Sequence, residues 1–137
     1  MCLSQLWDVP GNERFRRPGG LTGVYYKHSH GAMVTTDLAR RQTFLTARAW
    51  IEDFLGAPDI VDYWGEEGQP APILLVGNKS DLQNVTFNRE EYNLFVEEQN
   101  LLGFFEVFGP FLIRCNHPNL TSLLLRLLTC LAVWIKY

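Results

Sequence analysis

The stretch PILLVGNKSD at residues 72–81 decides the fold of this chain. Residues 73–77 are an uninterrupted apolar run, which is typical of a strand buried on both faces of a parallel sheet. A polar turn follows this strand directly. Ligands of parallel α/β sheets bind beyond the carboxyl ends of the strands, so we expect this turn to belong to a binding site.

Strand and helix patterns alternate around this stretch. Residues 31–36 are a compact run of β-formers, and apolar residues recur at helical spacing over 42–56 before a closing glycine. Asn88, with Glu91 three residues later, is a helix-capping signature, and residues 104–106 suggest another strand. We therefore expect an α/β fold with a mostly parallel sheet, right-handed crossovers and flanking helices.

Three further segments are predicted from weaker patterns. Residues 2–7 are expected to form a short strand that ends at Asp8, and residues 21–30 a short helix. Residues 57–72 hold two internal prolines, two glycines and several acids, so they are predicted to be a surface loop.

Composition limits the class of protein. The chain has 137 residues, of which 47% are apolar, and this fits one domain with a sizeable core. Its net charge of −3 offers no surface for nucleic acid. Three cysteines without C-x-x-C spacing predict neither a disulfide framework nor a zinc site, which favours a reducing cytosol.

The C-terminal part differs in composition from the rest. All 15 acidic residues lie at or before Glu106, so we divide the chain into 1–106 and a divergent segment, 107–137. Leucines at helical spacing predict an amphipathic helix near 119–136. A helix on a membrane surface is an alternative, whereas a spanning helix is disfavoured because the run is short and contains Arg126.

The turn after the apolar strand has the pattern N-K-x-D. The carboxylate of Asp81 can accept two hydrogen bonds from the edge of guanine, and adenine would leave it unpaired. Asn78 can tie the turn to neighbouring backbone, and the aliphatic stem of Lys79 can lie across the base. A lone N-K-x-D is more often a solvated turn. Its position after a buried strand, with a second motif upstream, makes the signal specific.

That second motif is WDVPGNERF at residues 7–15, and with it the chain resembles the Rab family of Ras-like small GTPases. The resemblance covers residues 3–106 and is also carried by VYYK at 24–27, TF at 43–44 and GFFE at 103–106. These segments look closest to the branch that serves lysosome-related organelles. The resemblance implies a P-loop NTPase fold, GTP or GDP and Mg²⁺ as ligands, Rab regulators and effectors as partners, and a switch in vesicle traffic.

The resemblance also implies roles for single residues. Asp8 would hold Mg²⁺ through water, and Gly11 would present its N–H to the terminal phosphate. Asn12 stands where the family typically has a glutamine that orients the attacking water. Asparagine is one methylene shorter, and a misplacement on the order of 1 Å can cost about a hundredfold in rate. For Asp8, a plain capping carboxylate at a strand turn is the alternative.

Other features depart from the family. The family opens with a strand, a phosphate loop (G-x-x-x-x-G-K-[ST]) and the first switch, and that loop pattern occurs nowhere in these residues, so we expect a truncated isoform. The family's first strand lies between those expected at 2–7 and 31–36. Without it, these two strands should close up or present unpaired edges. The last residues carry no prenylation signal.

We therefore expect a Rab-like GTPase polypeptide that binds and hydrolyses GTP by lineage, and that is catalytically incomplete in this form. The expected location is the cytoplasm, with peripheral association to endosomal or lysosome-related membranes. The alternative is a non-catalytic interaction module that keeps the second-switch surface of Trp7, Phe15, Tyr25 and Tyr26. A third possibility is a membrane-associated fragment dominated by its C-terminal helix.

Overall fold

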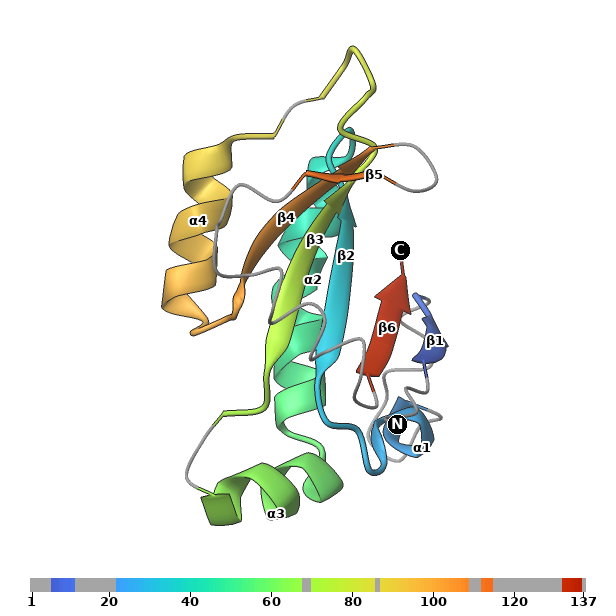
Figure 1. Ribbon diagram of the computed structural model, residues 1–137, viewed down its shortest axis with the longest axis vertical. Helices are drawn as coiled ribbons and strands as arrows, with labels where there is room; N and C mark the ends of the chain where they lie inside the picture. Colours follow the sequence, from blue (N-terminus) through green and yellow to red (C-terminus); the bar gives the residue numbers. More distant parts are fainter. Residues whose placement is uncertain are drawn as a thin grey trace.

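The computed structural model describes residues 6–11, 22–67, 70–85, 87–108, 112–114 and 132–136. Within these residues, strands form one six-stranded sheet in the order β1-β6-β2-β3-β4-β5 (Figure 1). The strands are β1 (Leu6–Pro10), β2 (Ala32–Asp37), β3 (Ile73–Asn78), β4 (Gly103–Phe108), β5 (Leu112–Arg114) and β6 (Ala132–Lys136). All neighbours are parallel except β4 and β5. The expected α/β fold with a mostly parallel sheet is confirmed.

Strands β2 and β3 form the centre of this sheet. They pair in register along their whole length and end side by side at Asp37 and Asn78. Ile73, Leu74 and Leu75 are at most 1% exposed, as expected for a central parallel strand. The apolar run therefore forms the buried strand that the sequence predicts, and it carries the N-K-x-D turn to the edge of the sheet.

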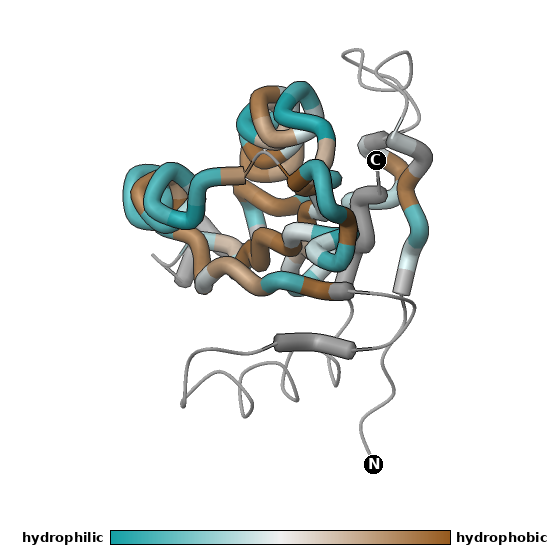
Figure 2. Tube along the Cα trace, turned by 90° about the horizontal axis from the view of Figure 1, so that it is seen from above, coloured by the Kyte–Doolittle hydropathy of each residue, from teal (hydrophilic) through white to brown (hydrophobic). Residues whose placement is uncertain are grey.

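Four helices are described: α1 (Thr22–Tyr26), α2 (Arg41–Leu55), α3 (Pro58–Glu67) and α4 (Arg89–Glu98). The amphipathic helix predicted over 42–56 is α2, which ends at Gly56. Its buried side chains are Phe44, Ala47, Trp50, Ile51 and Phe54. Viewed from above, hydrophobic residues gather between the strands and the helices, and hydrophilic residues lie on the outer sides of the helices (Figure 2).

Helix α3 corrects the prediction of a surface loop over residues 57–72. Pro58 lies at its first position, where a missing N–H has no helical partner to lose and the fixed φ suits a helix. Asp59 lies in the first turn, where a negative charge is favourable. Ile60 is only 2% exposed, so the helix is fixed to the core. Packing of Ile60 against the core favours the helix despite the loop-like composition.

Strand β6 corrects two predictions about the sheet. Residues 132–136 are extended, although a helix was expected near 119–136, and residues 119–131 lie outside the described part. Strand β6 pairs in parallel with β1 on one side and with β2 on the other. Strand β6 therefore keeps β1 and β2 from closing up on each other, and it pairs with β1 along Leu6–Pro10 and with residues 32–34 of β2. Their backbone N–H and C=O groups need a strand as partner, and the sequence AVWIK suits one because Val, Trp and Ile favour strands.

Candidate functional site

The turn that follows β3 is fastened to the strands on both sides of it. On one side, the Leu38 N–H donates to the backbone oxygen of Asn78 at 3.0 Å. On the other side, both the N–H and the hydroxyl of Ser80 donate to the Val107 carbonyl, each at 3.3 Å. The turn itself is closed by the Leu82 N–H, which donates to the Lys79 carbonyl at 3.2 Å. These bonds hold residues 79–82 in one place at the edge of the sheet.

An ion pair joins this turn to the end of β2. The Lys79 ammonium donates to Asp37 Oδ2 at 2.5 Å, and the Ala39 N–H donates to Asp37 Oδ1 at 3.0 Å. Both carboxylate oxygens of Asp37 are therefore engaged. Asp37 is only 6% exposed, whereas the Lys79 side chain is 49% exposed. The Lys79 side chain thus reaches from the turn to the end of β2.

The same contacts set the charge state of Asp37. Burial raises the pKa of this carboxyl, but the hydrogen bonds from Lys79 and Ala39 and the charges of Lys79 and Arg40 outweigh it. The net result is a pKa below the ordinary value, so Asp37 is ionised at neutral pH. This buried negative charge keeps the Lys79 ammonium at the end of β2.

Two backbone features show that the turn is tightly specified. Lys79 has φ = 64°, a left-handed conformation that costs a residue with a side chain about 1–2 kcal/mol. Strain of this kind persists only where surrounding contacts enforce it, and it is common at functional sites. Just before the turn, a Cβ on Gly77 would lie 2.6 Å from Leu38 and 2.9 Å from the Phe104 ring. Only glycine fits there.

The predicted ligand residues of the turn lie close together. Asp81 lies in the turn and is exposed. Asn78 does tie the turn to backbone, since its Oδ1 accepts the Lys79 N–H at 2.8 Å. The roles of Asn78, Lys79 and Asp81 in selecting guanine remain predictions.

Asp8 lies away from this turn, and it does not end its strand as the sequence predicts. Strand β1 continues through Asp8 to Pro10. Asp8 is paired with Trp134 of β6, and Trp134 is paired with Met33 of β2. Asp37 comes four residues after Met33, so Asp8 lies about 13 Å short of that level along the strands. In Figure 1, β1 and β6 end at a lower level than β2 and β3.

Strands β1 and β3 nevertheless run in the same direction in the same sheet, with β6 and β2 between them. Three strand spacings separate them laterally by about 14 Å. Gly11, the first residue after β1, is the described residue of this motif that lies closest to the rim. Asn12 lies outside the described residues.

The described residues offer few side-chain ligands for a magnesium ion. They contain no group of three or more His, Cys, Asp or Glu side chains that could hold a metal. Mg²⁺ needs only one or two protein carboxylates when phosphates and waters complete its shell. The exposed carboxylate of Asp8 meets that requirement, whereas Asp37 is already occupied by Lys79 and Ala39. In the role that the resemblance implies, Asp8 would hold the ion, and the ion would neutralise phosphate charge.

Two contributors to the site have no assigned role in the sequence prediction. Asp37 could have been found, because it follows a run of β-formers just as Asn78 follows the apolar strand. The Val107 carbonyl that accepts the hydrogen bonds of Ser80 could not have been found. Every residue has a backbone carbonyl, and only the register of β4 brings this one to Ser80.

Comparisons with known proteins agree with the geometry. The Ras family matches residues 1–108. Ras-related protein Rab-32B of Dictyostelium discoideum is 37% identical over 101 residues, which are 74% of this chain and 36% of that protein. Ras-related protein Rab-32 of Homo sapiens is 36% identical over 104 residues, which are 74% of this chain and 42% of that protein.

A third relative is more distant. Ras-related protein Rab-7L1 of Mus musculus is 30% identical over 106 residues, which are 77% of this chain and 48% of that protein. The chain thus spans less than half the length of these three relatives. The family match, the Rab relatives and the α/β sheet with its N-K-x-D turn lead to one conclusion: this chain belongs to the Ras family, as a Rab-like small GTPase family member.

Proposed function

We propose that this chain is the guanine-recognising part of a Rab-type switch in membrane traffic. The observation that carries the proposal is the N-K-x-D turn, held between β2 and β4 with Asp81 exposed. In this proposal, Asp81 accepts hydrogen bonds from the N1–H and the exocyclic amine of guanine. The stem of Lys79 lies along the base, and Asn78 fixes the backbone of the turn.

The phosphate side of the site is less complete within these residues. Asp8 would hold Mg²⁺, Gly11 would contact the terminal phosphate, and Asn12 would be a weakened water-positioning residue. None of the 137 residues forms the glycine-rich pattern that cradles phosphates. We therefore propose that these residues by themselves bind GTP very weakly and hydrolyse it undetectably, with residues 1–106 as the nucleotide-binding unit and 107–137 as a divergent segment.

Calorimetric titration with GDP and ADP tests base selection. We expect weak, magnesium-dependent binding of GDP and at least about tenfold weaker binding of ADP, because adenine leaves the Asp81 carboxylate unpaired. Asp81→Asn should remove this preference, whereas Asp62→Asn, an exposed aspartate of α3, should keep it. Equal affinity of the unaltered chain for both nucleotides would overturn the proposal.

A second function is favoured by a separate observation. Trp7 is 42% exposed, and its ring packs edge-on against Tyr25 with the centroids 6.1 Å apart. Large exposed aromatic side chains are typical anchors of protein interfaces. We propose that this pair belongs to a surface that binds Rab regulators or effectors even without nucleotide. Binding of a Rab effector domain that is lost in Trp7→Ala and unchanged by GDP would support this function.

The proposed location is the cytoplasmic face of endosomal or lysosome-related membranes. No helix in the part of the chain that the structure describes is long and apolar enough to cross a membrane. We propose that association is peripheral, and liposome flotation of the chain with and without residues 119–137 measures how much the C-terminal segment contributes.

A further inference from the structure

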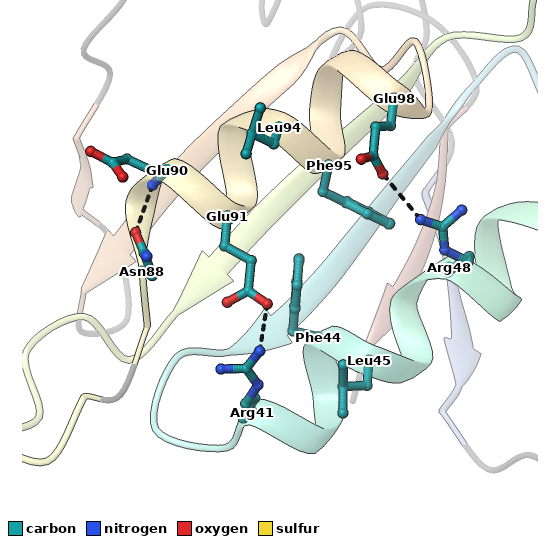
Figure 3. Close-up of a pocket in the computed structure, with 10 residues that line it drawn as sticks. All are labelled: Arg41, Phe44, Leu45, Arg48, Asn88, Glu90, Glu91, Leu94, Phe95 and Glu98. Atoms are coloured by element: carbon teal, nitrogen blue, oxygen red, sulfur yellow. Dashed lines mark hydrogen bonds and ion pairs between the residues drawn. The ribbon is translucent and has the colours of Figure 1, made fainter.

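Helices α2 and α4 lie side by side and enclose a groove between them (Figure 3). Its volume is about 640 Å³, and its lining comes entirely from these two helices and the residue that caps α4. None of the proposed nucleotide-binding residues lines it. A role for this groove is therefore independent of guanine binding.

The two walls of the groove repeat the same pattern with opposite charge. On α2, Arg41 and Arg48 flank Phe44 and Leu45. On α4, Glu91 and Glu98 flank Leu94 and Phe95. These two charged residues are seven positions apart on each wall, about two helical turns, and Glu90 adds a third acidic residue to the α4 wall. The groove therefore has one basic wall, one acidic wall and an apolar centre two turns long.

The floor of the groove is closely packed. Phe44 and Phe95 are 6% and 7% exposed, and their rings meet edge to face at 5.1 Å. The Arg48 guanidinium lies over the Phe95 ring, 5.3 Å from its centroid. The outer edges of the groove are more exposed than its floor, because Leu45 and Leu94 are 55% and 59% exposed. A rigid aromatic floor between exposed leucines offers apolar surface that a neighbouring side chain can bury.

The charged residues bridge the groove at both ends. Arg41 pairs with Glu91 at 2.6 Å, and Arg48 pairs with Glu98 at 3.3 Å. Both pairs are partly exposed: the arginine side chains are 61% and 48% exposed, and the glutamates 33% and 63%. A guanidinium has five N–H donors, so each arginine can bind a second carboxylate without leaving the first.

We propose that this groove binds an amphipathic helix of a partner protein. The helix carries a ridge of apolar side chains that packs on Phe44 and Phe95 between the two leucines. Its acidic flank faces the arginines of α2, and its basic flank faces the glutamates of α4. A second copy of this chain is the alternative occupant, because a two-fold axis could set the basic wall of one copy against the acidic wall of the other.

Two synthetic helical peptides of identical composition test the charge pattern. Both are about 18 residues long, roughly five turns, with the same leucine ridge. In the segregated peptide, glutamates occupy one flank and lysines the other. In the mixed peptide, both flanks alternate the two. A segregated helix turned end for end exchanges its flanks, so one orientation always matches the walls, whereas the mixed helix matches in neither.

Fluorescence anisotropy of labelled peptides measures the binding. The segregated peptide should bind at least about tenfold more tightly than the mixed one. Leu94→Ser should weaken the binding of the segregated peptide about tenfold or more, because the apolar contact with Leu94 at the outer edge of the groove is lost. Val61→Ser is the matched control, since Val61 is 52% exposed but lies on α3, away from the groove.

A charge reversal checks the basic wall separately. With Arg41→Glu and Arg48→Glu, both walls are acidic, so a peptide with lysines on both flanks should bind better than the segregated one. Circular dichroism melts of each variant identify any loss of folding.

Three results would overturn the proposal: equal binding of the segregated and mixed peptides, no binding of either, or equal weakening by Val61→Ser and Leu94→Ser. Sedimentation that shows self-association abolished by Leu94→Ser would assign the groove to a second copy instead, which also overturns it.

Discussion

Asp37 has the contacts of a residue that organises the N-K-x-D turn. Its buried carboxylate accepts hydrogen bonds from the Lys79 ammonium and the Ala39 N–H, and Lys79 itself has a left-handed backbone conformation. The ion pair is half exposed on the lysine side, so water screens part of its energy. Its main effect is therefore to fix where the Lys79 side chain lies.

The lowered pKa of Asp37 predicts a pH dependence. The ionised carboxylate is favoured in the folded state. Its contribution to the free energy of unfolding is therefore complete above the ordinary pKa of about 3.9, and it is lost as pH falls through the lower pKa of the folded state. Asp37→Asn should therefore reduce the free energy of unfolding by about 1–2 kcal/mol at pH 7 and by less at pH 3. Urea unfolding at both pH values measures this. A difference that stays constant, or a similar loss in Asp62→Asn, would contradict it.

Gly77 leads to a prediction about local packing. Ala at this position places a Cβ against the Phe104 ring, which cannot move as easily as the end of Leu38. We expect Gly77→Ala to lower the free energy of unfolding by about 1–3 kcal/mol. Gly23→Ala is the control, since a Cβ there meets nothing within 4 Å, and it should be neutral or slightly stabilising. Thermal melts in which Gly77→Ala and Gly23→Ala change stability equally would argue against this packing.

At the scale of elements, the parts predicted well are those whose pattern is local. The apolar run of β3 and the helical periodicity of α2 each contain enough information to fix the element. The cap of α4 is also local, and Asn88 does accept the Glu90 N–H at 2.9 Å. The predicted motif at 78–81 falls at the strand end for the same reason.

The elements that were mispredicted depend on distant partners. Residues 132–136 are extended because β1 and β2 lie on both sides of them, which no periodicity in the segment reveals. The register of β6 in turn sets the level of Asp8, so the stagger between Asp8 and Asp37 could not be predicted either. In the resemblance to Rab proteins, this position in the sheet belongs to the family's first strand.

The position of β6 predicts that its backbone supports β1. Val133→Pro removes an N–H from a strand with neighbours on both sides, where proline is not tolerated. We expect the free energy of unfolding to fall by an amount on the order of 2–3 kcal/mol. Amide hydrogen exchange should become faster in β1, whereas β3 and β4 should stay protected from exchange. Val133→Thr keeps the strand preference and the N–H, so it should leave the exchange of β1 unchanged. Unchanged exchange in Val133→Pro would contradict the pairing.

At the scale of the whole molecule, one sheet carries two separate surfaces. The carboxyl ends of β2 and β3 present the turn with Asp37, Lys79 and Asp81, and the helices on one face present the groove between α2 and α4. Strand β4 connects the two, because Val107 fixes Ser80 while the β3–β4 crossover contains α4. The two surfaces nevertheless share no residues, so occupancy of either can be measured without the other.

The most direct test of the central claim, that the turn at residues 78–81 recognises guanine, is a map of amide chemical shifts during titration with Mg²⁺–GDP and Mg²⁺–ADP. The method detects weak binding, which is what we expect of these residues alone. We predict that GDP shifts the amides of residues 78–82 and of Val107, and that ADP leaves them in place. The account would be contradicted if both nucleotides shifted the same amides equally, or if GDP shifted amides elsewhere and left this turn unchanged.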